Sequence, residues 1–555
     1  MKNFVQIVFP LSLLLFTNSL NAQVAPFIKW QKCFGGSGGE GAYSIQQTID
    51  GGFILAGSSW SNDGDVSGNH GGNDYWIVKL DVDGDVEWQK SLGGSEDDGA
   101  QSIQQTTDGG YIIAGTSQSN DNDVTGNHGF YNSYGNLINT NDYWIVKLSN
   151  DGSLVWQKSF GGTEDDQANS VLQTTDGGFI VAGTSRSNDG DVSGNHLDSL
   201  GYQTIDSWIV KLDTDGNLVW QKSLGGSGDD GAYSIEQTTD GGFIIAGNSN
   251  SNDGDVSVNH GYYDYYGNLI NSVDDWIMKL DITGNLVWEK SLGGSNVDRA
   301  SDIQQTSDGG FIVAGWTYSN DGDVSGNHGS GDCWIVKLDI PGNIVWQKSL
   351  GGINVDAARS VQQTNDGGYI VAGVSESDDG DVSGNHGIIG SSDYWIVKLD
   401  AIGNLIWQEC LGGSGNDYAW DIQQTSDDGF IVAGLSLSND GNISGNHGYY
   451  DCWIVKLTGD TLTGVASPST KSISFYPNPV ESQLWFNLTM PASEATIRVY
   501  DLQGRIRDCG LGLSNFGWSK SIQLNIENLP EGFYTIHIIN NKTGRSEVGK
   551  FVKVQ

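Results

Sequence analysis

The sequence is short of proline, methionine and positive charge, and each shortage narrows what the protein can be. Only 8 of 555 residues are Pro and 3 are Met, whereas 80 are Gly and 19 are Trp. With 37% hydrophobic residues, the chain has enough apolar surface to fold and is not of the disordered class. Its 27 basic residues against 68 acidic ones give a net charge of −41, which argues against nucleic acid or an anionic membrane as a partner.

Long apolar runs are also missing, except at the start of the chain. Lys2 precedes an apolar run over residues 4–16, and Ala22 supplies a small residue for cleavage before Gln23. That run is too short to span a bilayer. We therefore predict a secretory signal peptide over residues 1–22 and an exported mature protein, with an uncleaved anchor as the alternative.

Two tryptophan motifs recur along the rest of the chain. One, W-Q-K or a close variant, recurs every 58 to 68 residues from Trp30 to Trp407. The other, W-I-V-K-L with Met in one copy, has its tryptophans at Trp76, Trp144, Trp208, Trp276, Trp334, Trp395 and Trp453. A repeat of this length indicates units that bury their apolar faces against their neighbours.

Each unit contains four short apolar stretches, which in the first complete unit are residues 44–48, 53–57, 75–80 and 86–91. Asp50-Gly51-Gly52 joins the first two and Asp83-Gly84 the last two, and both are tight-turn signals. The stretches are rich in Ile, Val, Phe, Tyr and Trp, and no unit has a helical pattern. Four antiparallel strands in such a unit are typical of a β-propeller blade.

The two ends of the array indicate how it closes. The array begins with a lone fourth-strand motif at 27–34 and ends with a lone third-strand motif at 453–457. We therefore predict an all-β fold in which residues 27–457 form a monomeric seven-bladed propeller, closed by the N-terminal strand. An open solenoid is the alternative, but it requires capping units that the sequence does not show.

After a linker at 458–472, residues 473–555 alternate as a small C-terminal β-sandwich does. They carry Y-P-N-P at 476–479, Y-D-L-Q-G-R at 500–505, L-P-E-G-F-Y at 529–534 and a basic, apolar end at 550–554. This segment resembles the C-terminal sorting domain (type A) of the type IX secretion system of Bacteroidetes. The resemblance implies the type IX secretion machinery as a partner, and a secreted or outer-membrane cell-surface location. The propeller repeats also resemble those of secreted proteins from such bacteria.

The long loop between the second and third strands has the spacing of an EF-hand-like calcium loop. Oxygen-bearing side chains fall at positions one, three, five and twelve, with Gly at six, in three copies. We predict Ca²⁺ there, although polar turns whose side chains cap backbone amides are the alternative. The predicted metal ligands are Asp63, Asp65, Ser67, Asp74, Asp321, Asp323, Ser325, Asp332, Asp440, Asn442, Ser444 and Asp451.

Every unit also carries one histidine and one further acid. The histidines, from His70 to His447, are too widely spaced to share a metal, so we expect each to be hydrogen-bonded within its own turn. The acids, from Glu40 to Asp417, follow a G-G-S motif, and we expect them to make one face strongly acidic. Because an acid in every blade is architectural, these residues do not identify a catalytic site, and we assign none.

Inserts break the symmetry in two units, after Gly129 and Gly261. Their tyrosines are candidates for ligand binding, with packing against a neighbouring blade as the alternative. We predict a binding or adhesion module for a glycan or a protein. The rival is a secreted polysaccharide-degrading enzyme with a propeller catalytic domain, for which the predicted propeller offers few arginines. The candidate ligand-binding residues are Tyr131, Tyr134, Tyr263 and Tyr266.

Five cysteines remain, an odd number that leaves at least one thiol free. Only Cys33 and Cys452 fall in the same blade of the predicted ring, about one residue out of register. A disulfide between them would lock the ring but requires a bulge or another turn. The favoured alternative is that all five are thiols.

Overall fold

The computed structural model describes the repeat region almost continuously and the C-terminal region in parts. The described residues are 23–24, 26–131, 134, 137–263, 266, 269–387, 390–459, 461–462, 480, 482–487, 495–500, 506–507, 521–527, 529–540 and 546–554. The predicted signal peptide and Cys509 lie outside them, as does most of the predicted linker. One compact unit spans Val24–Thr461, and a second comprises Leu462–Gln555 with Met1–Gln23. Within the described ranges no helix is long and apolar enough to cross a membrane.

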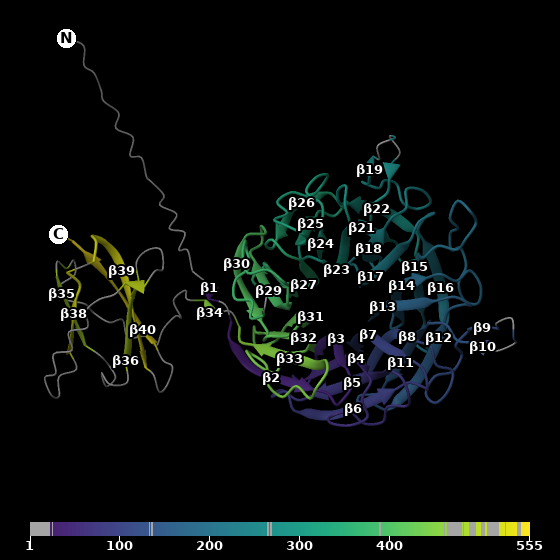
Figure 1. Cartoon of the computed structure of the whole chain (residues 1–555), viewed down its shortest axis with the longest axis horizontal. Coiled ribbons are helices and arrows are strands. Elements are labelled where there is room, and N and C mark those ends of the chain that lie inside the picture. The colour runs from purple at the N-terminus through teal and green to yellow at the C-terminus, as the bar shows by residue number, and fades with distance from the viewer. Residues whose placement is uncertain are drawn as a thin grey trace, which may run out of the picture. The chain divides into compact units, whose positions relative to one another are not determined.

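The first unit is a ring of seven four-stranded antiparallel sheets (Figure 1). From the innermost strand outward, the first three blades are β3 (Glu40–Gln47), β4 (Phe53–Ser59), β5 (Asp74–Leu80) and β6 (Val86–Leu92); β7 (Asp98–Gln105), β8 (Tyr111–Ser117), β11 (Asp142–Leu148) and β12 (Leu154–Phe160); and β13 (Asp166–Gln173), β14 (Phe179–Ser185), β15 (Asp206–Leu212) and β16 (Leu218–Leu224).

The next three blades follow the same order. They are β17 (Asp230–Gln237), β18 (Phe243–Ser249), β21 (Asp274–Leu280) and β22 (Leu286–Leu292); β23 (Asp298–Gln305), β24 (Phe311–Thr317), β25 (Asp332–Leu338) and β26 (Ile344–Leu350); and β27 (Asp356–Gln363), β28 (Tyr369–Ser375), β29 (Asp393–Leu399) and β30 (Leu405–Leu411).

The seventh blade is built from both ends of the repeat region. Its inner strands are β31 (Asp417–Gln424), β32 (Phe430–Ser436) and β33 (Asp451–Leu457), and its outermost strand is β2 (Ile28–Phe34). The backbone N–H of Thr458 donates to the carbonyl of Phe27 at 3.0 Å, beside the ladder that joins β2 to β33. The predicted all-β, seven-bladed ring with N-terminal closure is therefore confirmed.

The W-I-V-K-L motif forms the third strand of each blade, and all of its residues are buried in every blade. Trp76 is 1% exposed and packs in one core cluster with Ile431 and Ile454 of the preceding blade. The motif lysine is buried as well, and the Nζ of Lys79 lies 3.1 Å from Oδ2 of Asp50. The apolar core therefore consists of layers between neighbouring blades, each with one paired lysine at its edge.

Glutamine side chains tie the innermost strands together around the ring. Gln47 Oε1 accepts the backbone N–H of Ser426 at 2.8 Å, and the N–H of Gln47 donates to Gln423 Oε1 at 2.6 Å. The equivalent bonds join the first blade to the second, where the N–H of Gln105 donates to Gln46 at 2.7 Å. The bond to Gln47 Oε1 has an equivalent at every other junction. The bond to Gln423 has a glutamine equivalent at four of the other six junctions, because Leu172 and Glu236 replace the glutamine at the remaining two. The junction between the last blade and the first thus uses the bonds found at most of the others.

The cysteine register matches the sequence-based expectation. Cys33 lies opposite Trp453 and Cys452 lies opposite Phe34, one residue out of register. All four cysteines among the described residues are thiols: Cys33, Cys333, Cys410 and Cys452. The alternative without a Cys33–Cys452 disulfide is therefore the one that this structure shows.

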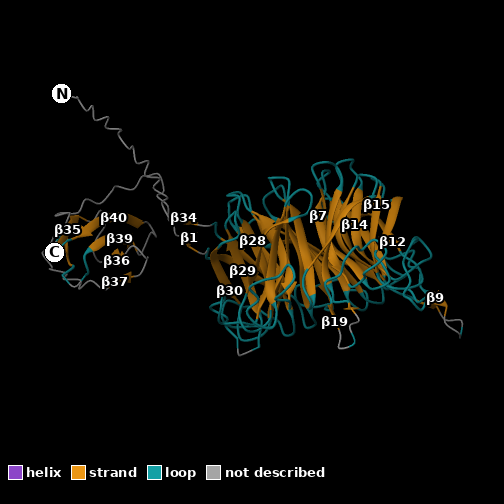
Figure 2. Cartoon of the chain, turned by 90° about the horizontal axis from the view of Figure 1, so that it is seen from above, coloured by secondary structure: helices purple, strands orange, loops and turns teal. Residues whose placement is uncertain are grey.

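The remaining described strands are short or belong to the second unit. The two inserts form hairpins, β9 (Phe130–Tyr131) with β10 (Leu137–Ile138) and β19 (Tyr262–Tyr263) with β20 (Leu269–Ile270), and both project from the same face of the ring (Figure 2). Strand β1 (Gln23–Val24) pairs with β34 (Thr461–Leu462). The second unit is a small β-sandwich with one sheet of β35 (Gln483–Asn487) and β38 (Ser521–Asn525), and another ordered β37 (Ile506–Arg507), β36 (Ala495–Tyr500), β39 (Gly532–Asn540) and β40 (Ser546–Lys553).

Candidate functional site

The innermost strand of every blade contains a β-bulge at the same place. In β3 the register against β4 shifts between Ala42 and Ser44, so that Tyr43 is the extra residue. A bulge turns the side chain of its extra residue away from the ladder, and such residues are frequent at functional sites. We call these seven residues the bulge ring: Tyr43, Gln101, Asn169, Tyr233, Ser301, Arg359 and Trp420.

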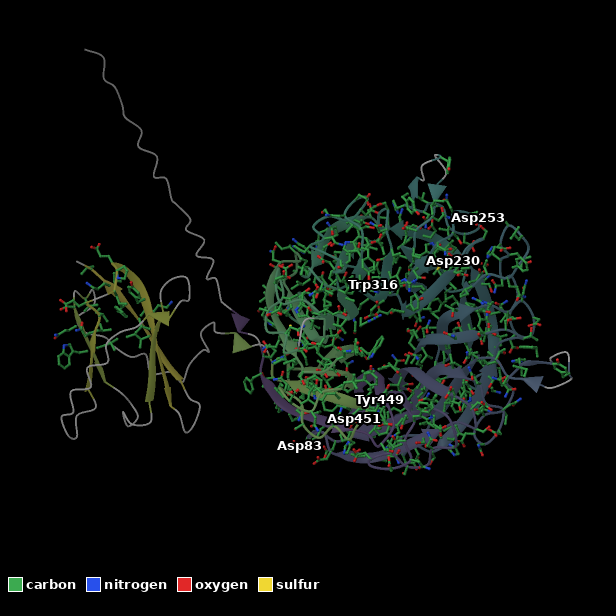
Figure 3. The ribbon with its side chains drawn as sticks, viewed as in Figure 1. Asp83, Asp230, Asp253, Trp316, Tyr449 and Asp451 are labelled. Carbon is green, nitrogen blue, oxygen red and sulfur yellow. The ribbon has the colours of Figure 1, made fainter. Side chains whose placement is uncertain are left out.

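All seven residues of the bulge ring line one cavity of about 400 Å³. The bulges lie near the start of the innermost strands, so this cavity opens on the face that carries the long loops. Arg299 of β23 and Trp316 of β24 also line it, and Figure 3 labels Trp316 beside the opening at the centre of the ring. The volume is within the range of small-molecule sites. We call this space the mouth cavity.

Aromatic rings hold two guanidinium groups in the mouth cavity. The guanidinium carbon of Arg299 lies 5.5 Å from the ring centroid of Trp316, which is directly opposite it on the neighbouring strand. That of Arg359 lies 4.7 Å from the ring centroid of Trp420. Tyr43 meets Trp420 edge-on, with 5.5 Å between centroids. Both arginines therefore make cation–π contacts that fix their planes.

The electrostatics of this arginine pair are unusual for so acidic a protein. Burial, and secondly the nearby charge of Arg299, lower the pKa of the Arg359 guanidinium. Among the described residues, no carboxylate forms an ion pair with either arginine. The seven W-I-V-K-L lysines differ, because each has a carboxylate within about 3 Å, as Lys456 has Asp427 at 2.8 Å.

Two aspartates in the cavity wall have a structural task. Asp421 Oδ2 accepts the backbone N–H of Ile45 in the next blade at 2.8 Å, and Asp302 Oδ2 accepts that of Val361 at 2.9 Å. Serine oxygens hold the corresponding bond at other junctions. Burial raises the pKa of both carboxyls, that of Asp421 to about 6. The two acids thus connect blades, and Asp421 can also hold a proton near pH 6.

The predicted calcium ligands each have protein partners, and the three copies agree. Asp63 Oδ1 accepts the N–H of Ser37 at 2.7 Å, and Asp65 Oδ2 accepts that of Gly35 at 3.2 Å. The fifth-position oxygen of the loop, in Ser67, accepts a hydrogen bond from the amide of Gln89. The corresponding bonds in the other two short loops involve Asp321, Asp323, Ser325, Asp440, Asn442 and Ser444.

The twelfth-position aspartates contact histidines of their own loops. Asp74 Oδ2 lies 2.7 Å from Nδ1 of His70, and Asp332 and Asp451 make the same contact with His328 and His447. Across the described ranges, no group of three or more His, Cys, Asp or Glu side chains could hold a metal ion. A cation in these loops stays a prediction.

The expectation that each histidine is hydrogen-bonded within its own loop is confirmed in all seven blades. In the second blade, the hydrogen bond to Asp142 raises the pKa of His128. At four junctions the histidine's Nε2 also lies within 4.0 Å of an aspartate in the next blade, as His70 does of Asp123 at 3.8 Å. The histidines therefore belong to the framework between blades.

The expectation that the G-G-S acids contribute to an acidic face, together with the long loops, is wrong for these acids because they are buried. These seven acids are the first residues of the innermost strands, which begin four residues earlier than the sequence suggested. Asp98 is 1% exposed, and it accepts the N–H of Gly94 at 2.7 Å and the hydroxyl of Ser119 at 2.9 Å. Burial raises its pKa to about 6. The chain bends back at the G-G motif, so that in each blade the backbone N–H of the second Gly donates to the buried acid.

Two of the candidate tyrosines of the inserts can be compared with the mouth cavity. Tyr134 and Tyr266 are 88% and 84% exposed, and neither lines the cavity. Tyr131 and Tyr263 end the strands β9 and β19, and their side chains are outside the described part of the chain.

Sequence reasoning missed the bulge ring, although the sequence contains a signal for it. In the innermost strand, the residue after the repeated alanine differs in almost every unit, while its neighbours repeat. It is Tyr, Gln, Asn, Tyr, Ser, Arg and Trp in chain order. Comparison of the seven units position by position would have singled it out.

Known proteins resemble different parts of this chain. Residues 474–554 match the family described as the secretion system C-terminal sorting domain. A 132-residue stretch is 31% identical to the regulatory protein FlaEY of Caulobacter vibrioides, covering 23% of this chain and only 13% of that protein's length. The Neurospora crassa Pan2 WD40 domain aligns with a TM-score of 0.34 at 12% identity, over 65% of this chain and 90% of its own.

A surface component of the type IX secretion system of Porphyromonas gingivalis, PorZ, aligns over 93% of each chain with a TM-score of 0.16 and 10% identity. Structural likenesses this weak say nothing of what this chain binds. The class is set by the fold itself, a seven-bladed β-propeller. Its C-terminal region is a type IX sorting domain, so the protein is exported by that machinery and is secreted or attached to the cell surface.

Proposed function

We propose that this exported propeller is a binding module whose ligand, a glycan or a protein segment, enters the mouth cavity and contacts the bulge ring. One observation carries the proposal: the inward-facing position that does not repeat is the position that a bulge aims into the cavity. Repeated residues serve the framework common to all blades. Residues that differ between blades give the cavity an asymmetric surface, which recognition of a particular ligand requires.

The chemistry of the bulge ring suits recognition. Tyrosine and tryptophan offer apolar area with a polar tip, arginine offers a rigid fork of donors, and amides offer both donors and acceptors. These are the residue types found at binding hot spots and in ligand pockets. Tyr134 and Tyr266 of the inserts provide a second surface for a larger partner, in keeping with their high exposure.

A polysaccharide-degrading enzyme is the second candidate, because a carboxyl that can hold a proton near pH 6, Asp421, lies in the same cavity as two arginines. Binding is the better proposal, since Asp302 and Asp421 both already hold backbone amides of the next blade. A general acid or base must instead be free to reach its substrate.

The test is a glycan and peptide array probed with the full chain and two variants. Tyr233→Ala with Asn169→Ala alters the bulge ring, and Tyr134→Ala with Tyr266→Ala alters the inserts. We expect the first variant to lose binding while its melting temperature stays within a few degrees of the wild-type value. Binding that is unchanged in the bulge-ring variant contradicts the proposal, and turnover of a bound glycan favours the enzyme.

A further inference from the structure

We propose that the mouth cavity recognises the carboxylate of an acidic sugar residue at the end of a glycan, with Arg299 and Arg359 as its binding pair. This inference rests on the proposed function and names the ligand chemistry of the same site. It begins from two cations that line one cavity and that form no ion pair with a carboxylate among the described residues, because Asp302 and Asp421 of the same wall bind backbone amides of the next blade.

The arginine pair differs from the buried W-I-V-K-L lysines in having no carboxylate partner among the described residues. All seven motif lysines are buried and have a carboxylate at about 3 Å, and the lysine of the second blade, Lys147, lies 3.0 Å from Asp108. Arg299 and Arg359 come from neighbouring blades, repel each other, and lack such a carboxylate among the described residues. Two like charges held together in this way favour an anion between them. Because the chain as a whole is strongly acidic, these two neighbouring arginines stand out as a local concentration of positive charge.

The cation–π contacts are compatible with anion binding by the same guanidinium groups. The guanidinium carbons of Arg299 and Arg359 lie over the rings of Trp316 and Trp420, and a guanidinium that stacks on an aromatic ring keeps its in-plane N–H groups for an anion. A planar carboxylate matches such a fork with two parallel hydrogen bonds. Lysine, a point charge, could not be held in this way, which explains why arginine occupies both positions.

A terminal sugar acid fits the remaining walls better than a polyanion or a protein surface. The bulge-ring residues of blades two to four, Gln101, Asn169 and Tyr233, supply amides and a hydroxyl, which pair with sugar hydroxyls. About 400 Å³ admits a small group but no folded domain. A long polyanion would also lie along a protein of net charge −41, which repels it, whereas a single terminal carboxylate brings only one negative charge to the arginine pair.

The experiment is titration calorimetry of the full chain with three probes: a trisaccharide ending in glucuronate, its neutral counterpart ending in glucose, and an alanine tripeptide with a free C-terminal carboxylate. We expect the glucuronate trisaccharide to bind more tightly than either of the others. Arg359→Gln should weaken it about ten- to hundredfold, the range of a charge-assisted hydrogen-bond pair. Arg359→Lys, which keeps the charge, should recover only part of that loss.

Arg186→Gln is the matched control, because Arg186 is an exposed propeller arginine that does not line the mouth cavity. It should bind like the wild type, and melting curves check that each variant folds. Equal binding of the neutral and acidic trisaccharides, or tighter binding of the tripeptide, overturns the inference. If Tyr233→Ala weakens binding of a glycan while Arg359→Gln does not, only the carboxylate inference fails. If neither variant affects any ligand that binds, the proposed function fails too.

Discussion

Asp275 is a buried acid whose removal should change how stability depends on pH. It lies on β21, is 1% exposed, and neither of its carboxyl oxygens has a hydrogen-bond partner. Burial, and then the charges of Asp298 and Asp274, raise its pKa well above the ordinary value. In three other blades this position is a tyrosine whose hydroxyl donates to the next blade, as Tyr75 does to the carbonyl of Trp144 at 2.9 Å.

The magnitude follows from proton linkage. Above pH 3.8, the ordinary pKa of this group, the unfolded chain has lost the proton that the folded protein keeps. A raised folded-state pKa therefore contributes stability below pH 3.8 that is lost as pH rises toward the folded-state pKa. The loss is about 1.4 kcal/mol per pH unit. For a carboxyl that stays protonated in the folded state from pH 4.5 to 6.5, it amounts to about 2.7 kcal/mol.

Asp275→Asn replaces the titrating carboxyl by an amide of similar shape that does not titrate. The free energy of unfolding in urea, measured at pH 4.5, 5.5 and 6.5, should favour the variant increasingly as pH rises. Other carboxyls titrate in both proteins, so their effects largely cancel in the difference. Asp215→Asn, in an exposed turn, controls for the loss of one acid from the chain. A difference between wild type and Asp275→Asn that is constant across the three pH values would refute the reasoning.

Three further predictions concern closure, cations and thiols. Deleting residues 27–34 should expose the edge of β33 and cause aggregation, and a deletion variant that stays monomeric with an unchanged melting temperature contradicts this closure. If calcium occupies the short loops, the melting temperature of the wild type should be higher in calcium than in chelator, and Asp321→Ala should reduce that difference. Equal melting temperatures in calcium and in chelator would contradict the calcium prediction. Peptide mapping without reduction should recover Cys33 and Cys452 as thiols, against which a linked peptide would count.

The fold could be predicted because its cause is local and repeated. The W-I-V-K-L strands and the glycine turns recur in every unit, and Gly51 and Gly84 have the positive φ values, 89° and 82°, that the turn signals imply. The acids were misplaced because Glu40 and four of its six equivalents precede a Gly, Gln or Arg residue, a pattern with little strand character. Only the three-dimensional G-G bend shows why a carboxylate is buried there.

The site could be predicted far less, for a physical reason. Analysis of a repeat sequence draws attention to the residues that recur in every unit, whereas the bulge ring consists of residues that differ between units. Arg299 and Arg359 are 60 residues apart in sequence, and they lie near each other because neighbouring blades converge at the mouth cavity. That convergence is a property of the closed ring and of no single unit, so neither arginine was singled out.

The glutamine hydrogen bonds that join the last blade to the first make the closing junction of the ring similar to the junctions within it. Gln47 bonds to Gln423 and Ser426 as its equivalents bond at most other junctions, and the chain ends of the ring lie side by side where Thr458 meets Phe27. The place where the polypeptide starts is therefore arbitrary for the fold. A circular permutant, with a short turn joining those ends and new termini in another loop between blades, should close into the same propeller.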